Sequence, residues 1–388
     1  MIGIDAVSFL VIVGAAAVAA LISAVVVPRL VVPVVVVELL LGIVVGPQVG
    51  DIAHLDSATR FFSNLGLGML FFFAGYEIDF ERVRGRPLRL AGAGWLISLA
   101  LAYGFAGILV LSDVIVSDIY TGSALATTAI GTLIPILRDS GELRTRFGTQ
   151  LLAAGAIGEF GPILLITLVL TTRHPAREAV ILVLFVVLAV FTGIFAVRST
   201  IMGWPILERT LESSGQLAVR LAVVLVFGLV ALANELGLDL LLGGFVAGMI
   251  TRLALRGHEV AIFESKLTAV GYGFLIPFFF VVSGMAFDVD ALFESAGALL
   301  KLPLFVALFL IVRGVPALLL YRRELPLRDR TALAFFCATE LPLVVAITTI
   351  ARSHHDMRVS TASALVGAAI ISTLVYPLIG LRLRRARA

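Results

Sequence analysis

The sequence is poor in charge, in cysteine and in the residue patterns typical of metalloenzymes. Only 14% of its 388 residues are Asp, Glu, Lys or Arg, against about a quarter in an ordinary soluble domain. The single cysteine, Cys337, excludes an internal disulfide and a cysteine metal cluster. No aspartate-rich or histidine-containing metal motif is present, and we expect no cofactor and no enzymatic activity. All five histidines fall in expected loops: His54, His174, His258, His354 and His355.

Long apolar segments take the place of the missing charge. Hydrophobic residues make up 60% of the chain, and the mean hydropathy is +1.10. Segments 6–28 and 267–287 carry no charge at all, and roughly 20 apolar residues span a bilayer as a helix. By this criterion we expect about thirteen spans, at 5–28, 30–46, 62–79, 88–112, 118–137, 148–172, 178–197, 215–234, 238–255, 267–287, 299–321, 327–351 and 359–381.

The sequence therefore predicts an all-α polytopic membrane protein. We expect residues 1–388 to form one integral domain without a soluble regulatory domain. Most of the 29 Lys and Arg residues fall in alternate loops, with the richest stretches at 82–89, 138–146, 322–330 and 382–387. Basic residues concentrate in cytoplasmic loops, which places the N-terminus outside and the C-terminus inside the cell. This bias accounts for the net charge of +3 without any nucleic-acid partner.

Two weak internal repeats and two prolines indicate a transporter. Leu39–Gly42 recurs at 240–243, and the phenylalanine run at 71–73 recurs at 278–280, each seven spans later. An odd offset inverts the second copy, as in many secondary transporters. Spans five and twelve contain Pro135 and Pro342, and proline breaks a helix. We therefore expect both spans to be broken and to form the transport site.

Five charged residues fall inside the expected spans, where a charge costs at least about 2.5–3.5 kcal/mol and is usually functional. They are Glu38, Glu159, Glu340, Arg220 and Arg313. Arg220 lies near a span end and can extend to the membrane surface. Glu159 and Arg313 each lie roughly 14 Å from the cytoplasmic ends of their helices. Equal depth on two helices allows the two side chains to pair.

Glu159 is the candidate for ion binding and proton exchange. Small residues surround it in the sequence, and these permit a cavity. Burial disfavours the charged form of a carboxylate and a neighbouring cation favours it, so a proton and a metal cation can compete for the same oxygens. Arg313 stays protonated and serves as the counter-charge. A single exchangeable carboxylate predicts one proton per monovalent cation, with no net charge moved.

The remaining candidates are polar residues beside the expected breaks. Thr127 and Thr128 offer hydroxyl oxygens at the first break, and we expect Glu159 and Thr128 to be the cation ligands. Glu340 lies beside the second break, where a structural or gating role and direct cation contact both stay open. Ser283 is a weaker candidate. Glu38 in the second span is expected to be structural.

Several motifs carry a resemblance to a known family. They are Glu38-Leu39-Leu40-Leu41-Gly42 with Gly46-Pro47, Phe71–Gly75 followed by Glu77 and Asp79, Ala126-Thr127-Thr128-Ala129, and Pro277–Phe280 followed by Gly284 and Asp288. Together they resemble the Kef-type branch of the cation:proton antiporter superfamily, over essentially the full length of the chain.

The resemblance implies a sodium/proton-antiporter-like fold of thirteen helices, with a mobile core domain and a dimerisation domain. It also implies a homodimer that works by elevator-like alternating access. In this family an acidic residue in the sixth span binds the ion, often after Asn, Gln or Asp. Here the pair is Gly158-Glu159. Arg313 and Glu340 match positions where the family carries a base and an acid. Nucleotide is not expected as a partner, because the regulatory domain of larger Kef-type proteins is missing.

Two other transport classes remain open at this stage. A gated cation channel needs a continuous polar path, which the sparse buried charge disfavours. A sodium-coupled symporter of a small organic anion would use a basic clamp, for which Arg313 alone is available. The sequence does not distinguish sodium from potassium as the transported cation.

Overall fold

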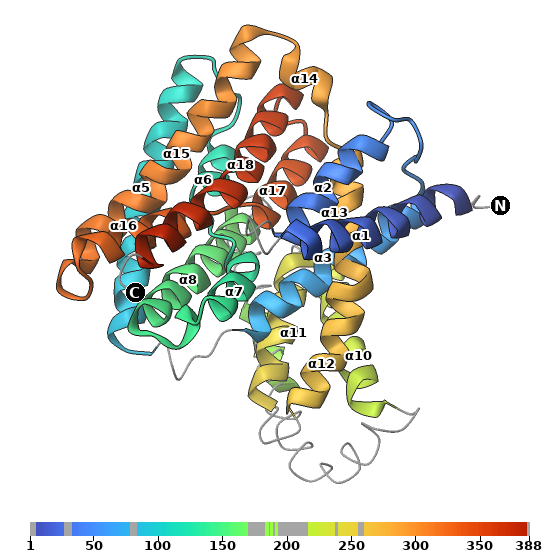
Figure 1. Cartoon of the computed structure of the whole chain (residues 1–388), viewed down its shortest axis with the longest axis horizontal. Helices are drawn as coiled ribbons and strands as arrows, with labels where there is room; N and C mark the ends of the chain where they lie inside the picture. The colour runs from blue at the N-terminus through green and yellow to red at the C-terminus, as the bar shows by residue number, and fades with distance from the viewer. Residues whose placement is uncertain are drawn as a thin grey trace. The chain divides into compact units, whose positions relative to one another are not determined.

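The computed structural model describes residues 5–26, 33–77, 84–169, 183–185, 187–188, 191–192, 216–236, 240–254 and 260–385. Within these residues the chain is helical and contains no strand (Figure 1). The chain divides into two compact units. The first unit comprises Met1–Ala16, His54–Asp79 and Ile163–Val282, and the second comprises Ala17–Ala53, Phe80–Pro162 and Ser283–Ala388.

Most helices lie wholly within one or the other of the two units. The first unit contains α3 (Ser57–Tyr76), α10 (Leu217–Glu235), α11 (Leu240–Ala254), α12 (Val260–Val270) and the π-helical turn η2 (Gly271–Leu275). The second contains α2 (Val34–Val45), α5 (Arg86–Leu111), α6 (Asp118–Leu125), α7 (Ile130–Asp139), α14 (Val289–Phe293), α15 (Ala296–Leu320), α16 (Leu327–Cys337), α17 (Pro342–Ser353) and α18 (Val359–Arg385). The second unit also holds the 3-10 turns η1 (Glu142–Arg144) and η3 (Tyr321–Arg323). Three helices have residues in both units: α1 (Ala6–Val26), α8 (Arg146–Val169) and α13 (Ile276–Met285).

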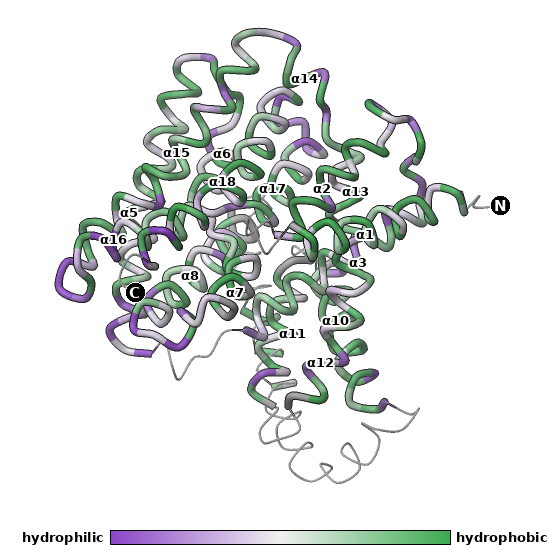
Figure 2. Tube along the Cα trace, in the orientation of Figure 1, coloured by the Kyte–Doolittle hydropathy of each residue, from purple (hydrophilic) through white to green (hydrophobic). Residues whose placement is uncertain are grey.

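The described helices agree with the predicted polytopic membrane fold. Six helical stretches of the described chain are long and apolar enough to cross a membrane: 6–25, 86–111, 262–285, 296–323, 327–353 and 359–384. Hydrophobic residues follow the helices, and hydrophilic ones gather at turns and helix ends (Figure 2). Every predicted span except 178–197 coincides with a helix or a pair of helices. Most of 178–197 lies outside the described residues.

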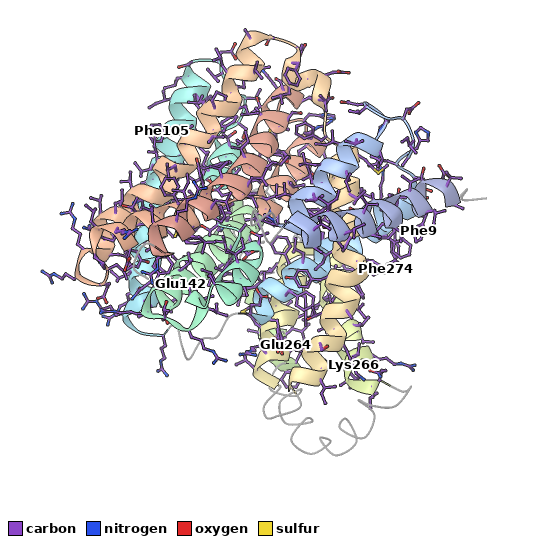
Figure 3. All side chains as sticks on the ribbon, in the orientation of Figure 1. Phe9, Phe105, Glu142, Glu264, Lys266 and Phe274 are labelled. Atoms are coloured by element: carbon purple, nitrogen blue, oxygen red, sulfur yellow. The ribbon has the colours of Figure 1, made fainter. Side chains whose placement is uncertain are left out.

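Ion pairs within the second unit join loops that the charge pattern assigned to one side of the membrane. Glu324 contacts Arg86, at 2.5 Å between Oε1 and Nε, and also Arg146. Arg384 binds both Glu142 and Asp329, with nitrogen–oxygen distances of 2.8 and 2.7 Å. Glu142 lies in the turn between α7 and α8 (labelled in Figure 3).

The loops assigned to the opposite side likewise meet one another. Arg358 pairs with Asp113 at 2.7 Å, and Lys301 donates to the Thr361 hydroxyl at 3.0 Å. Lys301 is buried on α15. The alternation of loops in this unit therefore agrees with the predicted order of spans.

Two spans are broken, as predicted, although proline explains only one break. Span twelve is interrupted at 338–341, and Pro342 is the first residue of α17, where its missing N–H costs nothing. Span five is interrupted at 126–129. Pro135 lies within α7, so the expectation that it breaks this span was wrong. The helix instead ends where two threonines and hydrogen bonds to residues distant in sequence offer the backbone other partners.

In the first unit, glycines let two helix backbones touch. A Cβ atom on Gly75 of α3 would collide with the carbonyl oxygen of Phe245 on α11. A Cβ on Gly248 of α11 would likewise collide with the carbonyl oxygen of Phe72. Small residues allow such close approach between membrane helices. Gly75 belongs to the motif at 71–75, so helix packing explains the glycine of that motif.

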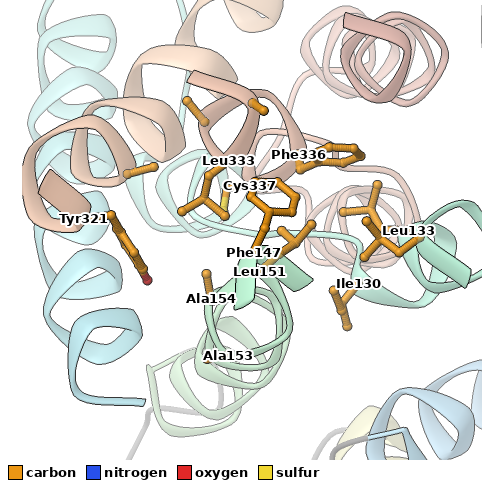
Figure 4. Packing of buried hydrophobic residues seen from close by; sticks show 14 of the residues in the cluster. Ile130, Leu133, Phe147, Leu151, Ala153, Ala154, Tyr321, Leu333, Phe336 and Cys337 are labelled. Carbon is orange, nitrogen blue, oxygen red and sulfur yellow. The ribbon is translucent and has the colours of Figure 1, made fainter. Parts of the chain in front are cut away.

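An apolar cluster in the second unit holds the broken helices in place (Figure 4). Leu133 of α7, Leu151 of α8 and Leu333 of α16 are fully buried in it. The rings of Phe147 and Phe336 meet edge to face, with centroids 5.8 Å apart. Close packing of this kind fixes the positions of its helices to within small tolerances. The cluster therefore fixes α7 and α16 against α8 immediately beside the candidate site.

Candidate functional site

The two breaks lie against each other in the second unit. The Ala129 N–H donates to the Thr339 carbonyl at 2.8 Å. The Thr128 hydroxyl donates to the Cys337 carbonyl at 2.6 Å. The Thr127 hydroxyl lies 2.9 Å from Oε2 of Glu340. Some of the backbone groups freed by each break are thus satisfied by residues of the other, and a membrane interior requires such partners.

Glu159 reaches this crossing from α8. Its side chain is buried, and the neighbouring Gly158 carbonyl accepts the Thr128 N–H at 3.0 Å. The Glu159 carboxyl faces the backbone N–H groups of Ile130 and Gly131 in the first turn of α7. A helix N-terminus favours an anion through these N–H groups and the helix dipole. The other carboxyl oxygen, Oε2, is buried without a hydrogen-bond partner in the described part of the chain.

Arg313 lies in the same site but does not pair with Glu159. No carboxylate of the described chain lies within 4.0 Å of its guanidinium, so the pairing expected from equal depth was wrong. Nε and Nη2 both donate to the Thr128 hydroxyl, at 2.9 and 2.7 Å. Nη1 donates to the Ser98 hydroxyl at 3.2 Å, and Nη2 also to the Ala154 carbonyl at 3.3 Å. The guanidinium is buried and held by neutral oxygens.

Thr128 is therefore a partner of Arg313 in this arrangement. A hydroxyl has one proton to donate and two lone pairs to accept with. The Thr128 hydroxyl proton is donated to the Cys337 carbonyl oxygen, and both lone pairs of the hydroxyl accept from Arg313. No lone pair is left for a cation while Arg313 stays in place. A role of Thr128 as a cation ligand beside Glu159 would require Arg313 to move, and it stays a prediction.

Gly158 explains why the guanidinium can lie where it does. A Cβ atom at this position would collide with Nη2 of Arg313 and would lie 2.8 Å from the Thr128 hydroxyl. Real Cβ atoms essentially never approach other atoms this closely. The space where a side chain at 158 would begin is thus filled by Arg313 and Thr128. In this arrangement there is accordingly no room at 158 for a side chain such as Asn, Gln or Asp.

Several supporting residues were missed by the sequence reasoning. Ser98 of α5 accepts from Arg313 and donates to the Val312 carbonyl at 2.9 Å. The Trp95 indole donates to the Ala126 carbonyl at the first break, at 3.2 Å. At the second break, Ser372 and Thr373 donate to the Glu340 carbonyl, at 3.1 and 3.2 Å. Hydroxyl residues in apolar spans are the only signal in the sequence for these roles.

Ser283 and Glu38 are not joined to this crossing by any hydrogen bond between described residues. Ser283 is half-buried on α13. Glu38 is buried on α2, and its Oε2 has no hydrogen-bond partner in the described chain. The weak ion-binding role of Ser283 and the structural role of Glu38 stay predictions.

Comparison with known proteins identifies the family of the chain. The model of the family described as sodium/hydrogen exchanger, transmembrane, matches residues 16–381. The chain belongs to the sodium/hydrogen exchanger family. Within this family's fold, the solved structure of the sodium proton antiporter MjNhaP1 from Methanocaldococcus jannaschii at pH 8 matches with a TM-score of 0.62 at 15% identity. The match covers 96% of this chain and 97% of that one.

Curated relatives agree with the family match. The chain is 27% identical over 363 residues to the putative Na(+)/H(+) antiporter YjbQ of Bacillus subtilis strain 168, covering 87% of this chain. It spans only 57% of the length of that relative. It is 28% identical over 275 residues to the Na(+)/H(+)-K(+) antiporter GerN of Bacillus cereus, covering 69% of each chain.

Proposed function

We propose that this member of the sodium/hydrogen exchanger family is a secondary active transporter exchanging a monovalent cation, sodium or potassium, for protons. The observation that carries the proposal is the Glu159 carboxyl. It is buried at the N-terminus of α7, beside two crossing helix breaks, with one oxygen free of hydrogen bonds in the described chain. The names of its relatives as antiporters of sodium, protons and, for GerN, potassium support the same activity.

In the proposed cycle, Glu159 holds either a proton or the cation. The protonated carboxyl is neutral, and the ionised carboxyl with a bound monovalent cation is also neutral in sum. Arg313 keeps its charge in both states and stays hydrogen-bonded to Thr128, Ser98 and Ala154. The site therefore has the same total charge in each direction of transport. One proton then moves per cation, and the exchange is electroneutral.

The further features of the proposal follow the resemblance of the motifs to the Kef-type branch. The protein works by elevator-like alternating access as a homodimer in the cell membrane. Its N-terminus is outside, its C-terminus is cytoplasmic, and it needs no cofactor beyond the transported ions. Of the two threonines, Thr127 is the candidate hydroxyl ligand that leaves Arg313 in place, because its described contacts are with Ala124 and Glu340 and not with Arg313.

Proton movement in proteoliposomes tests the proposal. Purified protein is reconstituted with a pH-sensitive dye inside, and sodium or potassium gradients are imposed with and without an ionophore that clamps the voltage. We expect a cation gradient to drive protons in the opposite direction, independently of voltage. Glu159→Gln should reduce this movement to background, while Glu294→Gln, on an exposed residue after α14, should not.

Other outcomes would reject the proposal in distinct ways. Proton movement that requires no opposing cation and follows voltage would indicate a channel. Cation uptake that drives no protons, but depends on an organic anion, would indicate a symporter. Full activity in Glu159→Gln would remove Glu159 from the mechanism while leaving the exchange itself in place.

A further inference from the structure

Glu340 is the second carboxyl at the crossing, and its surroundings differ from those of Glu159. The whole residue is 0% exposed. Its Oε2 lies 2.9 Å from the Thr127 hydroxyl, and its Oε1 has no hydrogen-bond partner in the described chain. No Lys or Arg nitrogen of the described chain lies within 4.0 Å of it. Among the described residues, the carboxyl therefore has one hydrogen-bonding contact, with the neutral hydroxyl of Thr127.

The proton count at Thr127 favours a neutral acid. The Thr127 hydroxyl lies 2.9 Å from Oε2 of Glu340 and also 2.9 Å from the Ala124 carbonyl oxygen. A hydroxyl has one proton, so it can serve only one of these two acceptors fully. If Glu340 is protonated, its O–H donates to Thr127 and the Thr127 proton goes to Ala124. Both short contacts are then complete hydrogen bonds.

The proton count at Thr127 does not by itself establish that Glu340 is protonated, since the Ser372 and Thr373 hydroxyls also lie near two carbonyls each. Ser372 faces Glu340 and Ala369 at 3.1 and 2.8 Å, and Thr373 faces the same two at 3.2 and 2.9 Å. The other carboxyl oxygen of Glu340, Oε1, distinguishes the two protonation states. An ionised carboxylate buried with an unpartnered oxygen and no ion pair carries a large desolvation cost. A neutral acid leaves only a carbonyl oxygen unpaired, at a much smaller cost.

The charged and titratable groups around Glu340 do not supply the missing partner. Arg313 is near enough to act on Glu340 through space, but its donors are engaged with Thr128, Ser98 and Ala154. Tyr376 of α18 also faces Glu340, and its hydroxyl donates to the Val306 carbonyl at 2.6 Å. The Glu340 main chain is bound by Ser372 and Thr373, so the side chain is not needed to cap the break.

We propose that Glu340 keeps its proton throughout the transport cycle and acts as a neutral hydrogen-bond donor that positions Thr127. Glu159 is then the only carboxyl that exchanges its proton, although two carboxyls lie at the crossing. The transport consequences rest on the proposed function, since they concern how many protons accompany each cation. The protonation state of Glu340 does not rest on it and can be measured without transport.

Replacement by glutamine separates the two carboxyls. The amide of Glu340→Gln can donate to Thr127 from the same position, so exchange should stay within about threefold of wild type, still electroneutral and with an unchanged pH profile. Glu340→Leu removes the donor and should lower exchange more than Glu340→Gln. Glu159→Gln should abolish it. Loss of exchange in Glu340→Gln as complete as in Glu159→Gln would overturn the proposal, as would a change in charge moved per cation.

Infrared difference spectroscopy gives a readout that needs no transport. A buried neutral carboxyl has a C=O stretching band separate from that of a carboxylate. We expect a band that is absent from Glu340→Gln and constant across the pH range in which Glu159 titrates. Thr127→Val should shift this band by removing its hydrogen-bond partner, while Thr127→Ser should leave it in place. A band that disappears as the pH rises through that range would overturn the proposal.

The two readouts fail independently of each other. If wild-type protein moves no protons with either cation, the proposed exchange is wrong, and the infrared band still decides the state of Glu340. If exchange occurs but no such band is assigned to Glu340, the exchange proposal stands and the neutral role of Glu340 falls. If Glu340→Gln does not fold, the band shift between Thr127→Val and Thr127→Ser tests the same contact.

Discussion

Two arginines in the second unit are held in opposite ways. Arg384 at the end of α18 binds two carboxylates, Glu142 and Asp329, and its guanidinium also lies 4.5 Å from the centre of the Phe147 ring. Arg313 at the crossing binds two hydroxyls and a carbonyl, with no carboxylate of the described chain within 4.0 Å. Both are largely buried. The difference lies in whether the partner carries a charge.

This difference separates a structural ion pair from a transport site. A carboxylate bound to arginine is stabilised as an anion, and that bond must break before a proton or cation can take its place. The contacts of Arg384 suit a permanent link between α18, η1 and α16. At the crossing, hydroxyls hold the arginine, and the carboxyl of Glu159 keeps a free oxygen. The positive charge of Arg313 is therefore present without being bound to the Glu159 carboxyl, the group proposed to exchange its proton.

Of the effects that test this comparison, the largest is expected from displacing Arg313 through the backbone of α8. Gly158→Ala places a methyl group where Nη2 of Arg313 lies, so the guanidinium must leave Thr128 or α8 must shift. We expect exchange in proteoliposomes to fall at least about tenfold, which corresponds to about 1.4 kcal/mol. Gly92→Ala on α5 is the matched control, because nothing lies within 4 Å of a Cβ there. Wild-type exchange in Gly158→Ala would show that the position of Arg313 is not needed.

A smaller effect, on stability alone, is expected at the other arginine. Arg384→Leu removes the ion pairs with Glu142 and Asp329 and should destabilise the protein by on the order of 2 kcal/mol, given the partial exposure of the site. Thermal unfolding in detergent measures this loss. Arg382→Gln, at an exposed position on α18, should change little. Exchange per folded molecule should stay near wild type in Arg384→Leu, and a selective loss of exchange would contradict the structural role.

The sequence predicted the spans and the site helices well, because hydropathy and depth are local properties. Thr127 and Glu340 meet at the crossing as expected, since each lies midway along its span beside a break. Glu159 lies midway along its unbroken span and faces the first turn of α7. The partner of Arg313 could not be predicted in this way. Depth along an axis does not fix the rotation of a helix about that axis. It also does not show that Ser98 and Thr128 compete with Glu159 for the guanidinium.

Helix ends and breaks were predicted less well for a related reason. The first break falls at 126–129, at Thr127 and Thr128 as expected, but Pro135 does not cause it, because the deciding contacts come from residues distant in sequence, such as Thr339 and Trp95. The helix α3 begins at Ser57, ahead of the predicted start at residue 62. Its start is fixed by reciprocal bonds between Asp56 and Thr59, a polar pair that a hydropathy window does not detect.

The smallest expected effect concerns a carboxylate that is fully bonded at a helix N-terminus, in contrast to Glu159. Hydrogen bonds from the N–H groups of Thr59 and Asp5 hold the pKa of the Asp56 carboxyl below its ordinary value of 3.8. The stability that this carboxylate adds is therefore present above its ordinary pKa and is lost as pH falls through the lowered pKa. Asp56→Ala should weaken the first turn of α3 by about 1 kcal/mol at neutral pH.

Amide hydrogen exchange in the first turn of α3 measures this difference, with Ser57→Ala at an exposed neighbouring position as the control. The gap between wild type and Asp56→Ala should close in acid, because protonation removes the same bonds that the substitution removes. Cation/proton exchange should be unaffected, since Asp56 lies in the first unit and the proposed site lies in the second. A gap that persists in acid would show that packing, and not the charge of the cap, stabilises this turn. The difference between Asp56 and Glu159 would then lie only in Oε2 of Glu159, which has no hydrogen-bond partner in the described chain.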